Sequence, residues 1–407
     1  MNHHAVIRPE ARASGPADPL RGRDILCFST DWSWDAMAMT HLMRLLAREN
    51  RVLWVDSIGY RRPTASRSDA GRVMRKLRAA LAPVREVEPN LFVISPLIIP
   101  LYDRASLRAA NRRLLRVQVA RALRRLGFGR PVNFVFLPTA GLVAGDFGEE
   151  PLIYYCVDEF SAFSGVSPRA LAEQEADLAL RSDLVVVTST PLLRSKSPLN
   201  PRTVLVRHGV DFEHFRRALD PATRIPDAIA GLPRPILGFF GLVGADWVDV
   251  GLLARVADRF PHGSLVIMGL VATDVSALRE RPNVHLLGRV PYADLPAFCK
   301  GFDVGLIPFR INEVTLNSNP LKAREYLAAG LPVVSTAIPE VEVLGQCRIG
   351  ADEESFLDQV AASLDDPGPS LARSESMRPE TWAARLDELR AHLSDLIPRG
   401  PGGGAGR

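Results

Sequence analysis

An ammonium group and a carboxyl group stand three residues apart within residues 317–334. If this stretch is helical, Lys322 and Glu325 lie on one face, because side chains three positions apart are neighbours on a helix. Such a pair can present a positive charge to a diphosphate and a carboxylate to ribose hydroxyls. A surface ion pair that binds no ligand is the alternative, since exposed pairs of this kind are common.

The same stretch predicts a short helix with clear ends. Asn319 is a suitable N-cap, Pro320 suits the first helical position, and Gly330 suits the C-terminal turn. Lys322 and Arg324 then stand near the positive end of the helix dipole, which costs about 0.3–1 kcal/mol per charge. A bound anion would make the same arrangement favourable.

A second candidate group follows an apolar run at residues 152–156. Asp158 stands where a side chain at the end of a strand can point into a cleft between domains. A carboxylate in such a place can remove the proton of a hydroxyl group as its oxygen attacks an electrophile. Two alternatives stay open: Asp158 could cap the next helix, and its neighbour Glu159 could take the same role.

Common phosphate-binding signatures are absent from the sequence. There is no GxxxxGK(S/T) motif, and the glycines at 238, 241 and 244 follow an apolar run without forming GxGxxG. The next apolar run, residues 265–268, ends without an acid that could hold a ribose. These observations disfavour a dinucleotide-linked oxidoreductase. Gly241 either lets the backbone approach a ligand or allows a helix to pack closely on the sheet.

The composition is that of a globular protein large enough for two domains. The chain has 407 residues, of which 47% are hydrophobic and 24% charged. Its four cysteines are far apart and form no CxxC motif, so we expect neither a disulfide framework nor a structural zinc site. The first residues lack an apolar signal region and no apolar run matches a bilayer, which predicts a cytoplasmic protein that does not cross the membrane.

Short apolar runs alternate with helical patterns, which predicts parallel sheets covered on both faces. Strands are expected at residues 24–28, 52–56, 91–95, 132–137, 152–156, 184–189, 204–206, 236–240, 265–268, 284–287, 303–307 and 332–335. The predicted fold class is α/β, with two Rossmann-like doubly wound domains facing a cleft. The expected parts are a disordered N-terminus (1–20), an N-terminal domain (21–215), a linker (216–234), a C-terminal domain (235–375), a C-terminal helix (376–397) and a flexible tail (398–407).

Positive charge is concentrated in residues 61–130, which contain 17 Lys and Arg against four acidic residues. Within this basic block, residues 106–126 predict a helix with an apolar stripe on one side and Arg113, Arg121 and Arg124 on the other. This pattern suits peripheral contact with an anionic membrane. A helix packed on the core with a solvated arginine face is the alternative. No aromatic residue is interleaved with the arginines, so we expect no nucleic-acid partner.

Two tryptophans follow the first expected strand. Trp32 and Trp34 could contact a sugar ring of an acceptor or a lipid, because their rings are large and amphipathic. They could equally close the hydrophobic core. The sequence leaves this choice open.

Taken together, several segments resemble motifs of GT-B glycosyltransferases. They are residues 206–215 (VRHGVDFEHF), 283–290 (NVHLLGRV), 322–334 (KAREYLAAGLPVV) and 154–159 (YYCVDE) followed by 181–189 (RSDLVVVTS). The resemblance is closest to family 4-like enzymes of cell-surface polysaccharide assembly, including the teichuronic acid type, with some likeness to the xanthan glucuronosyltransferase. It implies a GT-B fold, a nucleotide-sugar donor held by the C-terminal domain, a glycan or lipid-linked acceptor held by the N-terminal domain, and no cofactor or obligatory metal.

The resemblance also assigns roles to individual residues. It places Asp158 on the catalytic base, Lys322 on the donor phosphates, Glu325 on the ribose, and Arg289 and Val290 against the nucleotide base. Further candidate donor-binding residues are Gly241, Asn317 and Ser318.

The chain departs from the family 4 pattern at two places. Asn317 stands where family 4 enzymes have a second acid, and residues 241–251 lack the expected Lys and Arg. Lys322 would then neutralise the diphosphate, and transfer with inversion would follow. An inactive sugar-nucleotide binding or scaffold protein, or less readily a nucleotide-sugar epimerase, is the alternative function.

Overall fold

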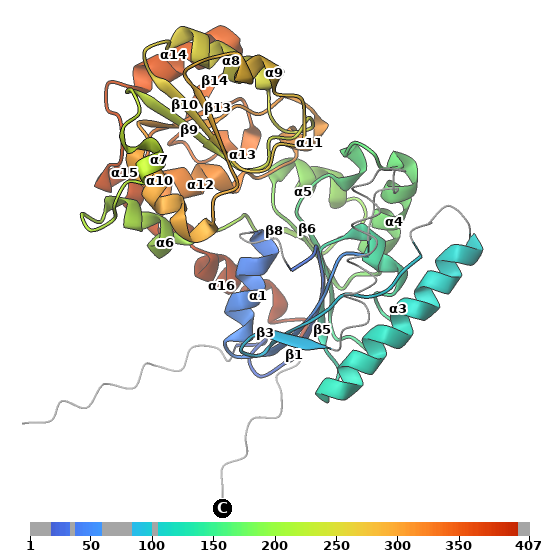
Figure 1. The fold of residues 1–407 in the computed structure, drawn as a ribbon. Coiled ribbons are helices and arrows are strands. Elements are labelled where there is room, and N and C mark those ends of the chain that lie inside the picture. The colour runs from blue at the N-terminus through green and yellow to red at the C-terminus, as the bar shows by residue number, and fades with distance from the viewer. Residues whose placement is uncertain (1–17, 33–36, 59–83, 100–104, 398–407) are drawn as a thin grey trace, which may run out of the picture.

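The computed structural model describes residues 18–32, 37–58, 84–99 and 105–397. Within these residues the chain forms two α/β lobes, each built around one sheet (Figure 1). The expectations for Trp34, for the tail, for most of the N-terminal segment and for much of the basic block lie outside the described residues.

An eight-stranded sheet, with the order β3-β4-β2-β1-β5-β6-β7-β8, forms the N-terminal lobe. Neighbouring strands are parallel except β3 and β4, which are antiparallel. The strands are β1 (Asp24–Phe28), β2 (Arg51–Val55), β3 (Arg85–Glu88), β4 (Leu91–Ile94), β5 (Val132–Val135), β6 (Leu152–Cys156), β7 (Leu184–Val187) and β8 (Thr203–Leu205). The helices are α1 (Ala38–Ala47), α3 (Ala105–Leu126), η1 (Pro138–Leu142), η2 (Phe160–Ala162), α4 (Pro168–Arg181) and α5 (Thr190–Lys196).

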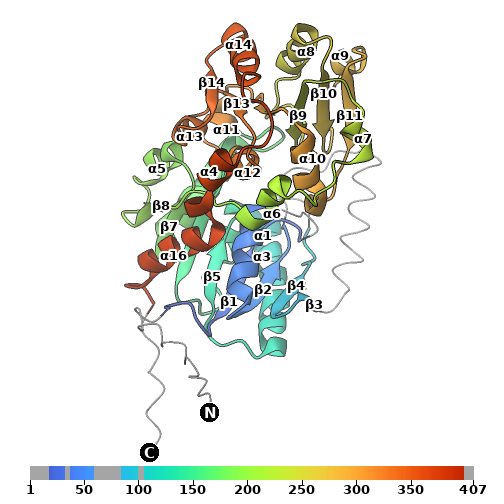
Figure 2. The ribbon, with the colours of Figure 1, turned by 90° about the vertical axis from the view of Figure 1, so that its left-hand side faces the viewer.

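Both faces of this sheet are buried, which explains why its central strands are apolar at consecutive positions. In β1, Ile25 and Cys27 belong to one hydrophobic core, whereas Leu26 and Phe28 belong to a second core on the other face. Helix α1 contributes to the first core and α3 to the second, and they cover opposite faces of the sheet (Figure 2). The prediction of a parallel sheet covered on both sides is confirmed for this lobe.

The C-terminal lobe contains an all-parallel six-stranded sheet with the order β11-β10-β9-β12-β13-β14. Its strands are β9 (Ile236–Phe240), β10 (Ser264–Met268), β11 (Val284–Gly288), β12 (Val304–Ile307), β13 (Val333–Thr336) and β14 (Arg348–Gly350). Its helices are α6 (Phe212–Arg216), η3 (Arg217–Leu219), α7 (Asp227–Ala230), α8 (Val250–Arg259), α9 (Ser276–Arg279), η4 (Tyr292–Asp294), α10 (Leu295–Gly301), α11 (Glu313–Leu316), α12 (Leu321–Ala328), α13 (Pro339–Glu342), α14 (Glu353–Ser363), α15 (Leu371–Glu375) and η5 (Arg378–Glu380).

The connection between the lobes is shorter than the sequence predicts. Residues 216–234, the expected linker, contain η3 and α7, and Ile229 of α7 is fully buried in the C-terminal core. Val210 and Phe215 already belong to that core, whereas Val206 still belongs to the N-terminal core. The chain therefore changes lobe between Val206 and Val210, because the apolar residues that follow pack at once on the second sheet.

A second connection returns the chain to the N-terminal lobe beside the first. The last helix, α16 (Trp382–Leu393), buries Leu386 and Leu389 in the N-terminal core. At the crossing the backbone nitrogen of Val210 donates to the Glu380 oxygen over 2.9 Å. A Cβ atom on Gly209 would lie 2.5 Å from the Trp382 nitrogen, so the two connections approach closely only because residue 209 is glycine.

Candidate active site

Three glycines follow or end neighbouring strands of the C-terminal sheet and form a bare backbone edge. Gly241, Gly269 and Gly288, at the ends of β9, β10 and β11, have φ angles of +130°, +133° and +72°. A Cβ atom on Gly269 would lie 1.9 Å from the Gly241 oxygen, so a larger residue would clash there. Ligands of open parallel sheets bind at the carboxyl ends of the strands. This glycine edge therefore lies where a ligand of such a sheet is expected to bind.

The two explanations of the glycine segment apply to different glycines. A Cβ atom on Gly238 would lie 2.1 Å from the Phe302 ring, so Gly238 serves close packing inside the lobe. A Cβ atom on Gly241 would instead lie 2.4 Å from Cε and 2.7 Å from Nζ of Lys322. Gly241 thus leaves the space that the Lys322 side chain occupies.

Lys322 holds its ammonium group at the glycine edge over aromatic rings. Its Nζ lies 5.8 Å from the centroid of Phe239 and 5.5 Å from that of Phe309. Burial lowers the pKa of Lys322, while the nearby Glu325 opposes this shift. Among the described residues no carboxylate oxygen lies within the 4.0 Å of an ion pair with Lys322. The surface ion pair with Glu325 is therefore not present, and the ammonium group is available to an anion.

The start of α12 differs from the prediction in a way that leaves its amides uncapped. Pro320, not Asn319, is the N-cap residue, and it provides no side-chain hydrogen bond to the first turn. Asn319 is occupied elsewhere: its Nδ2 donates to the Thr188 oxygen over 2.7 Å, and its Oδ1 accepts from Arg324 over 2.7 Å. Arg324 is also buried against Glu380, so Lys322 is the cation of this helix start that faces the glycine edge.

Glu325 is a buried carboxyl group one turn further along α12. It is 7% exposed, and burial raises its pKa to about 7, with Lys322 opposing the shift and Asp211 adding to it. Tyr292 lies close enough for the field of Glu325 to raise the tyrosine pKa, which burial already raises. No hydrogen bond to the Glu325 carboxyl group is present among the described residues. The group is thus free to accept hydrogen bonds from the hydroxyls of a ligand.

Glu325→Gln is expected to stabilise the protein at pH 8 by about 2–3 kcal/mol and to have little effect at pH 4. A carboxyl group whose folded pKa is raised binds more protons in the folded state, so its contribution becomes unfavourable as the pH rises from about 4.5 to about 7. Urea unfolding of both proteins across this range measures the difference. Glu342→Gln, on an exposed side chain, is the matched control; equal stability of Glu325→Gln and wild type at every pH would contradict the burial argument.

Arg289 and Val290 follow β11 at the same edge of the sheet. The Arg289 side chain is exposed, and Val290 packs on the C-terminal core. Two residues later the Tyr292 ring stacks on His214 with centroids 4.5 Å apart. The assignment of Arg289 and Val290 to a nucleotide base stays a prediction, and their place beside the glycine edge is consistent with it.

Asn317 and Ser318 use their side chains within the loop before α12. Asn317 Nδ2 donates to the Glu313 oxygen over 2.7 Å, and Ser318 Oγ donates to the Thr315 oxygen over 2.8 Å. The Asn317 backbone oxygen accepts a hydrogen bond of 2.6 Å from Ser189 of the N-terminal lobe. These contacts shape the loop and join the lobes, and a donor-binding role for either side chain stays a prediction.

Asp158 lies on the N-terminal side of the same junction. Thr188 Oγ1 donates to the Val157 oxygen over 3.1 Å, and the Thr188 oxygen accepts from Asn319 over 2.7 Å. Two hydrogen bonds through Thr188 therefore link Val157, the residue before Asp158, to Asn319 just before α12. The Asp158 side chain is half-buried, and burial, helped by the charge of Glu159, raises its pKa to about 7. Among the described residues its carboxyl group forms no hydrogen bond, so it caps no helix.

Glu159, the alternative to Asp158, is committed to the interior of the lobe. It is buried, and Lys196 Nζ donates to its carboxylate over 2.7 Å. Ser161 Oγ donates to the other carboxylate oxygen over 2.6 Å. Both oxygens are therefore occupied, which leaves Asp158 as the acid that can accept a proton from a substrate.

The loop after Asp158 also reaches the loop after the glycine edge. The backbone nitrogen of Ser164 donates to Asp246 over 3.2 Å, and the Phe163 and Trp247 rings have centroids 5.9 Å apart. The loop that carries Asp158 thus runs from one contact between the lobes, beside Thr188, to another at Ser164. Contacts of this kind connect segments that are far apart in the sequence, and no sequence pattern indicates them.

Trp32 packs on the N-terminal lobe. Its ring contacts Trp54 edge to face at 4.9 Å, and the Arg44 guanidinium lies 5.3 Å from its centroid. The backbone nitrogen of Trp32 donates to Asp56 over 2.9 Å. The ring is half-buried against the core, so this placement favours closing the core over contact with an acceptor.

Helix α3 covers the outer face of the N-terminal sheet (Figure 1). Leu115, Val119 and Ala122 are buried as expected for its apolar stripe. The predicted cationic positions of this helix are all exposed: Arg113, Arg121 and Arg124. Among the described helices, none has both the length and the apolar character needed to cross a bilayer.

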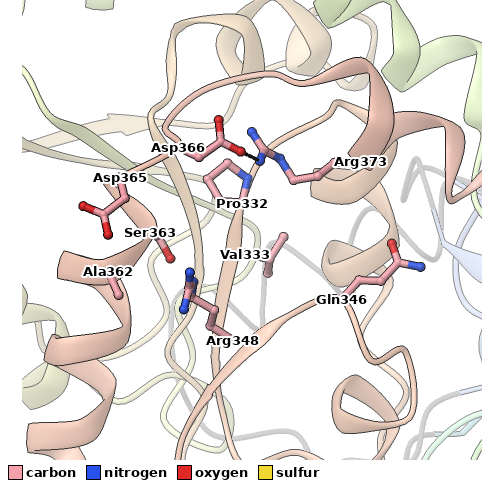
Figure 3. Close-up of a pocket in the computed structure, with 9 residues that line it drawn as sticks. All are labelled: Pro332, Val333, Gln346, Arg348, Ala362, Ser363, Asp365, Asp366 and Arg373. Carbon is pink, nitrogen blue, oxygen red and sulfur yellow. Dashed lines mark hydrogen bonds and ion pairs between the residues drawn. The ribbon is translucent and has the colours of Figure 1, made fainter.

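A pocket of about 180 Å³ lies at the opposite end of the C-terminal sheet (Figure 3). Its lining includes Pro332 and Arg348, which stand at the amino ends of β13 and β14. Arg373 in its wall already pairs with Asp366 and donates to the Gly330 oxygen over 2.7 Å. The pocket is thus remote from the carboxyl edge of the strands and separate from the candidate active site.

Two sets of residues in the site were missed by the sequence analysis. Gly269 and Gly288 complete the glycine edge, and the signal that points to them is a glycine directly at the end of each expected strand. Thr188 and Lys196 act through contacts with distant residues, for which the sequence offers no signal.

Comparison with known proteins agrees with this geometry. Residues 234–366 match a family model described as Glycosyl transferases group 1. TuaH of Bacillus subtilis (strain 168), described as a teichuronic acid biosynthesis glycosyltransferase, is 26% identical over 218 residues. That match covers 50% of this chain and 54% of TuaH, so the chain spans about half the length of the curated relative it matches.

Solved structures share the two-lobed architecture over nearly the whole chain. An alpha,alpha-trehalose-phosphate synthase (UDP-forming) from Burkholderia xenovorans, in complex with glucose-6-phosphate, superposes with a TM-score of 0.66 at 14% identity, covering 92% of this chain and 100% of that one. HepE from Anabaena, in complex with UDP, gives a TM-score of 0.62 at 12% identity with the same coverage of each chain. The chain therefore has the GT-B glycosyltransferase fold, and its C-terminal lobe carries a match to the group 1 glycosyl transferases.

Proposed function

We propose that the chain is a glycosyltransferase that moves a sugar from a nucleotide-sugar donor to a glycan or lipid-linked acceptor in the synthesis of a cell-surface polysaccharide. One observation carries the proposal. An available ammonium group and a helix start without an N-cap side-chain bond in one lobe lie across the contact between Thr188 and Asn319 from the loop that carries an unbonded carboxyl group of raised pKa in the other lobe. The likeness to TuaH supports the polysaccharide role, and the UDP complex of HepE supports a nucleotide-sugar donor.

In this mechanism the donor diphosphate lies at the glycine edge. Lys322 and the first amides of α12 stabilise the negative charge that develops on the leaving diphosphate. Because these groups are already in place, we propose that neutralisation needs no obligatory metal and no cofactor. Glu325 accepts hydrogen bonds from the ribose hydroxyls, and Arg289 and Val290 lie against the base.

Asp158 acts as the general base on the acceptor side. It removes the proton of the acceptor hydroxyl as that oxygen attacks the anomeric carbon, and the bond to the diphosphate breaks. A single displacement of this kind inverts the anomeric configuration. With a pKa of about 7, Asp158 is ionised in the upper part of the neutral range, and transfer should fall as the pH drops below about 7.

A panel of nucleotide sugars tests the proposal directly. A donor that binds the folded state raises the melting temperature, and the stabilising donor is then incubated with glycan and lipid-linked acceptors. Product analysis separates three outcomes: a new glycosidic product supports transfer, an isomerised donor supports an epimerase, and stabilisation without any product supports an inactive binding protein. The unbonded Asp158 carboxyl group, whose loop is bonded to Thr188 at the lobe junction, favours the first outcome.

We also propose that the N-terminal lobe rests on the anionic inner face of the plasma membrane through α3. Val117 of α3 is 58% exposed between the arginines. Gln118 donates to the Leu97 oxygen over 2.9 Å and so holds the exposed Leu97 beside the helix. Apolar side chains within a cationic surface match the chemistry of anionic headgroups above an acyl layer.

Vesicle flotation is expected to show this contact. The protein should float with vesicles containing anionic phospholipid and stay in solution with purely zwitterionic ones, and the triple variant Arg113→Glu, Arg121→Glu, Arg124→Glu should lose flotation. Changing three exposed arginines of the C-terminal lobe to glutamate (Arg224, Arg259 and Arg279) gives a control with a charge change of the same sign and size. Flotation that is unchanged by the arginine substitutions would refute the proposed surface.

A further inference from the structure

A network of three charged side chains is buried beneath the loop that carries Asp158. Lys196 of α5 is 5% exposed, Glu175 of α4 is 3% exposed and Glu159 is 7% exposed. Lys196 Nζ donates to Glu159 over 2.7 Å and to Glu175 over 2.9 Å. One ammonium group thus joins two carboxylates from separate elements inside the N-terminal lobe.

Further hydrogen bonds complete the network. Tyr154 donates its hydroxyl hydrogen to Glu175 over 2.5 Å, and Ser161 donates to Glu159 over 2.6 Å. Cys156 Sγ lies 3.4 Å from a Glu175 oxygen and 3.4 Å from the Asp158 backbone oxygen. Every carboxylate oxygen of the two glutamates therefore has a donor, and β6, α4, α5 and the loop after β6 are tied at one point.

A buried network of charged side chains adds little stability compared with an apolar core of the same volume. Apolar residues of similar volume in place of a buried ion pair are often neutral or stabilising, whereas loss of one partner is strongly destabilising. A fully bonded polar network instead fixes one arrangement of the chain. In this lobe the fixed arrangement includes residue 159, directly next to the proposed general base.

The network also carries an electrostatic imbalance. Burial lowers the pKa of Lys196, but its neighbours, Glu175 and Glu159 among them, raise this pKa by more than burial lowers it. The pKa therefore lies above its ordinary value, and Lys196 stays protonated. Two carboxylates face this single ammonium group. After burial, the charge of Glu159 is the second cause that raises the pKa of Asp158.

We propose that Glu159, held by Lys196, which Glu175 also binds, is a positioning residue that fixes the Asp158 loop at the lobe junction and sets the charge that the Asp158 carboxyl group meets there. This inference rests on the proposed function, because it gives Asp158 the role of base. Glu159 itself touches no substrate in this scheme and acts through its neighbour.

The pKa of Asp158 can be measured without any substrate. Wild type and Asp158→Asn are unfolded with urea at several pH values between 4 and 9. Because the folded pKa of Asp158 is raised, the folded state binds the extra proton, and wild type should lose stability relative to Asp158→Asn as the pH rises towards about 7. The change levels off at the folded pKa of Asp158. Because its lower end is set by the unfolded chain, a shift of the folded pKa moves the midpoint in the same direction by about half as much.

The same pair of proteins is then made in a Glu159→Gln background. Removing the charge of Glu159 is expected to move the midpoint to lower pH by about half a unit or more. Glu175→Gln is the matched control: it removes a carboxylate from the same network but leaves the pair between Glu159 and Lys196, so the midpoint should stay in place. An unmoved midpoint with Glu159→Gln, or equal shifts in both backgrounds, overturns the inference.

A turnover measurement separates this inference from the proposed function. With the donor found by the panel, the pH profile of kcat/KM is measured for Glu159→Gln. The pH below which kcat/KM falls should move to lower values, as the unfolding midpoint does. If Asp158→Asn keeps full transfer, the base role fails, while the unfolding experiment still decides whether Glu159 acts on Asp158. If Asp158→Asn is inactive and the pH profile of Glu159→Gln does not move, only the inference fails. Should Glu159→Gln not fold, the triple variant Glu159→Gln, Glu175→Gln, Lys196→Met takes its place, since it removes all three charges of the network and leaves none of them buried without a partner.

Discussion

Asp158→Asn is expected to reduce sugar transfer by about 10²–10⁴-fold, the range that a positioned general base contributes. Asparagine has nearly the same shape but cannot take the acceptor proton. Donor affinity should stay unchanged, because in the proposed mechanism the donor binds to groups of the other lobe, at the glycine edge and α12. Transfer is measured as release of nucleoside diphosphate in the presence of acceptor, and donor binding is measured by calorimetry.

The control for this variant is another aspartate of the same lobe. Asp177→Asn removes an exposed carboxylate that pairs with Arg181 on the surface of α4, and it should leave transfer at the wild-type rate. If Asp158→Asn turns over as fast as wild type, Asp158 is not the base. If it loses donor binding as well, the two lobes are coupled more tightly than the mechanism requires.

Lys322→Met is expected to weaken nucleoside diphosphate binding by about 10–100-fold, since a hydrogen bond to a charged group contributes about 1.5–3 kcal/mol. Methionine keeps much of the apolar stem between Phe239 and Phe309 but removes the ammonium group. Calorimetric titration with the nucleoside diphosphate of the preferred donor gives the dissociation constant.

Lys300→Met provides the comparison for the loss of one positive charge. Lys300 Nζ donates to the Asp220 oxygen over 2.6 Å on the surface of the same lobe, so its removal should not change the dissociation constant. Gly241→Ala supplies an independent check, because the added methyl group would displace the Lys322 side chain and should weaken binding in the same way. An unchanged dissociation constant in Lys322→Met would refute the diphosphate role.

Most strands were predictable because both faces of each sheet are buried, which leaves continuous apolar runs in the sequence. The exceptions have physical causes. β3 (Arg85–Glu88) is a charged antiparallel edge strand, and charge on an edge protects against unwanted pairing but hides the strand from an apolar pattern. β14 (Arg348–Gly350) is too short to give a pattern at all.

The start of α12 shows how tertiary contacts override a local preference. Asn319 is a good N-cap by type, yet its amide bonds across the lobe junction to Thr188 and its oxygen bonds to Arg324. A sequence indicates which residues favour a cap but not which distant partners compete for the same side chain. The prediction of the helix was right, and the prediction of its N-cap was wrong for this reason.

The choice between Asp158 and Glu159 illustrates the same limit at the site itself. Adjacent carboxylates after a strand are equivalent in the sequence, and both could serve as a base. Lys196, 37 residues further along the chain, occupies Glu159 and leaves its neighbour free. Residue types therefore offered two candidates for a base, and the choice between them depended on a contact that only the fold creates.

Arg324 connects helix α12 to the segment of the chain that returns to the first lobe. Its guanidinium nitrogen lies 3.2 Å from the carboxylate of Glu380, immediately before the crossing at Thr381 and Trp382. A force that tilts α12 is thus transmitted directly to the returning segment. The seating of α12 is therefore coupled to the position of the returning helix through Glu380, whose carboxylate also pairs with Arg385 of α16.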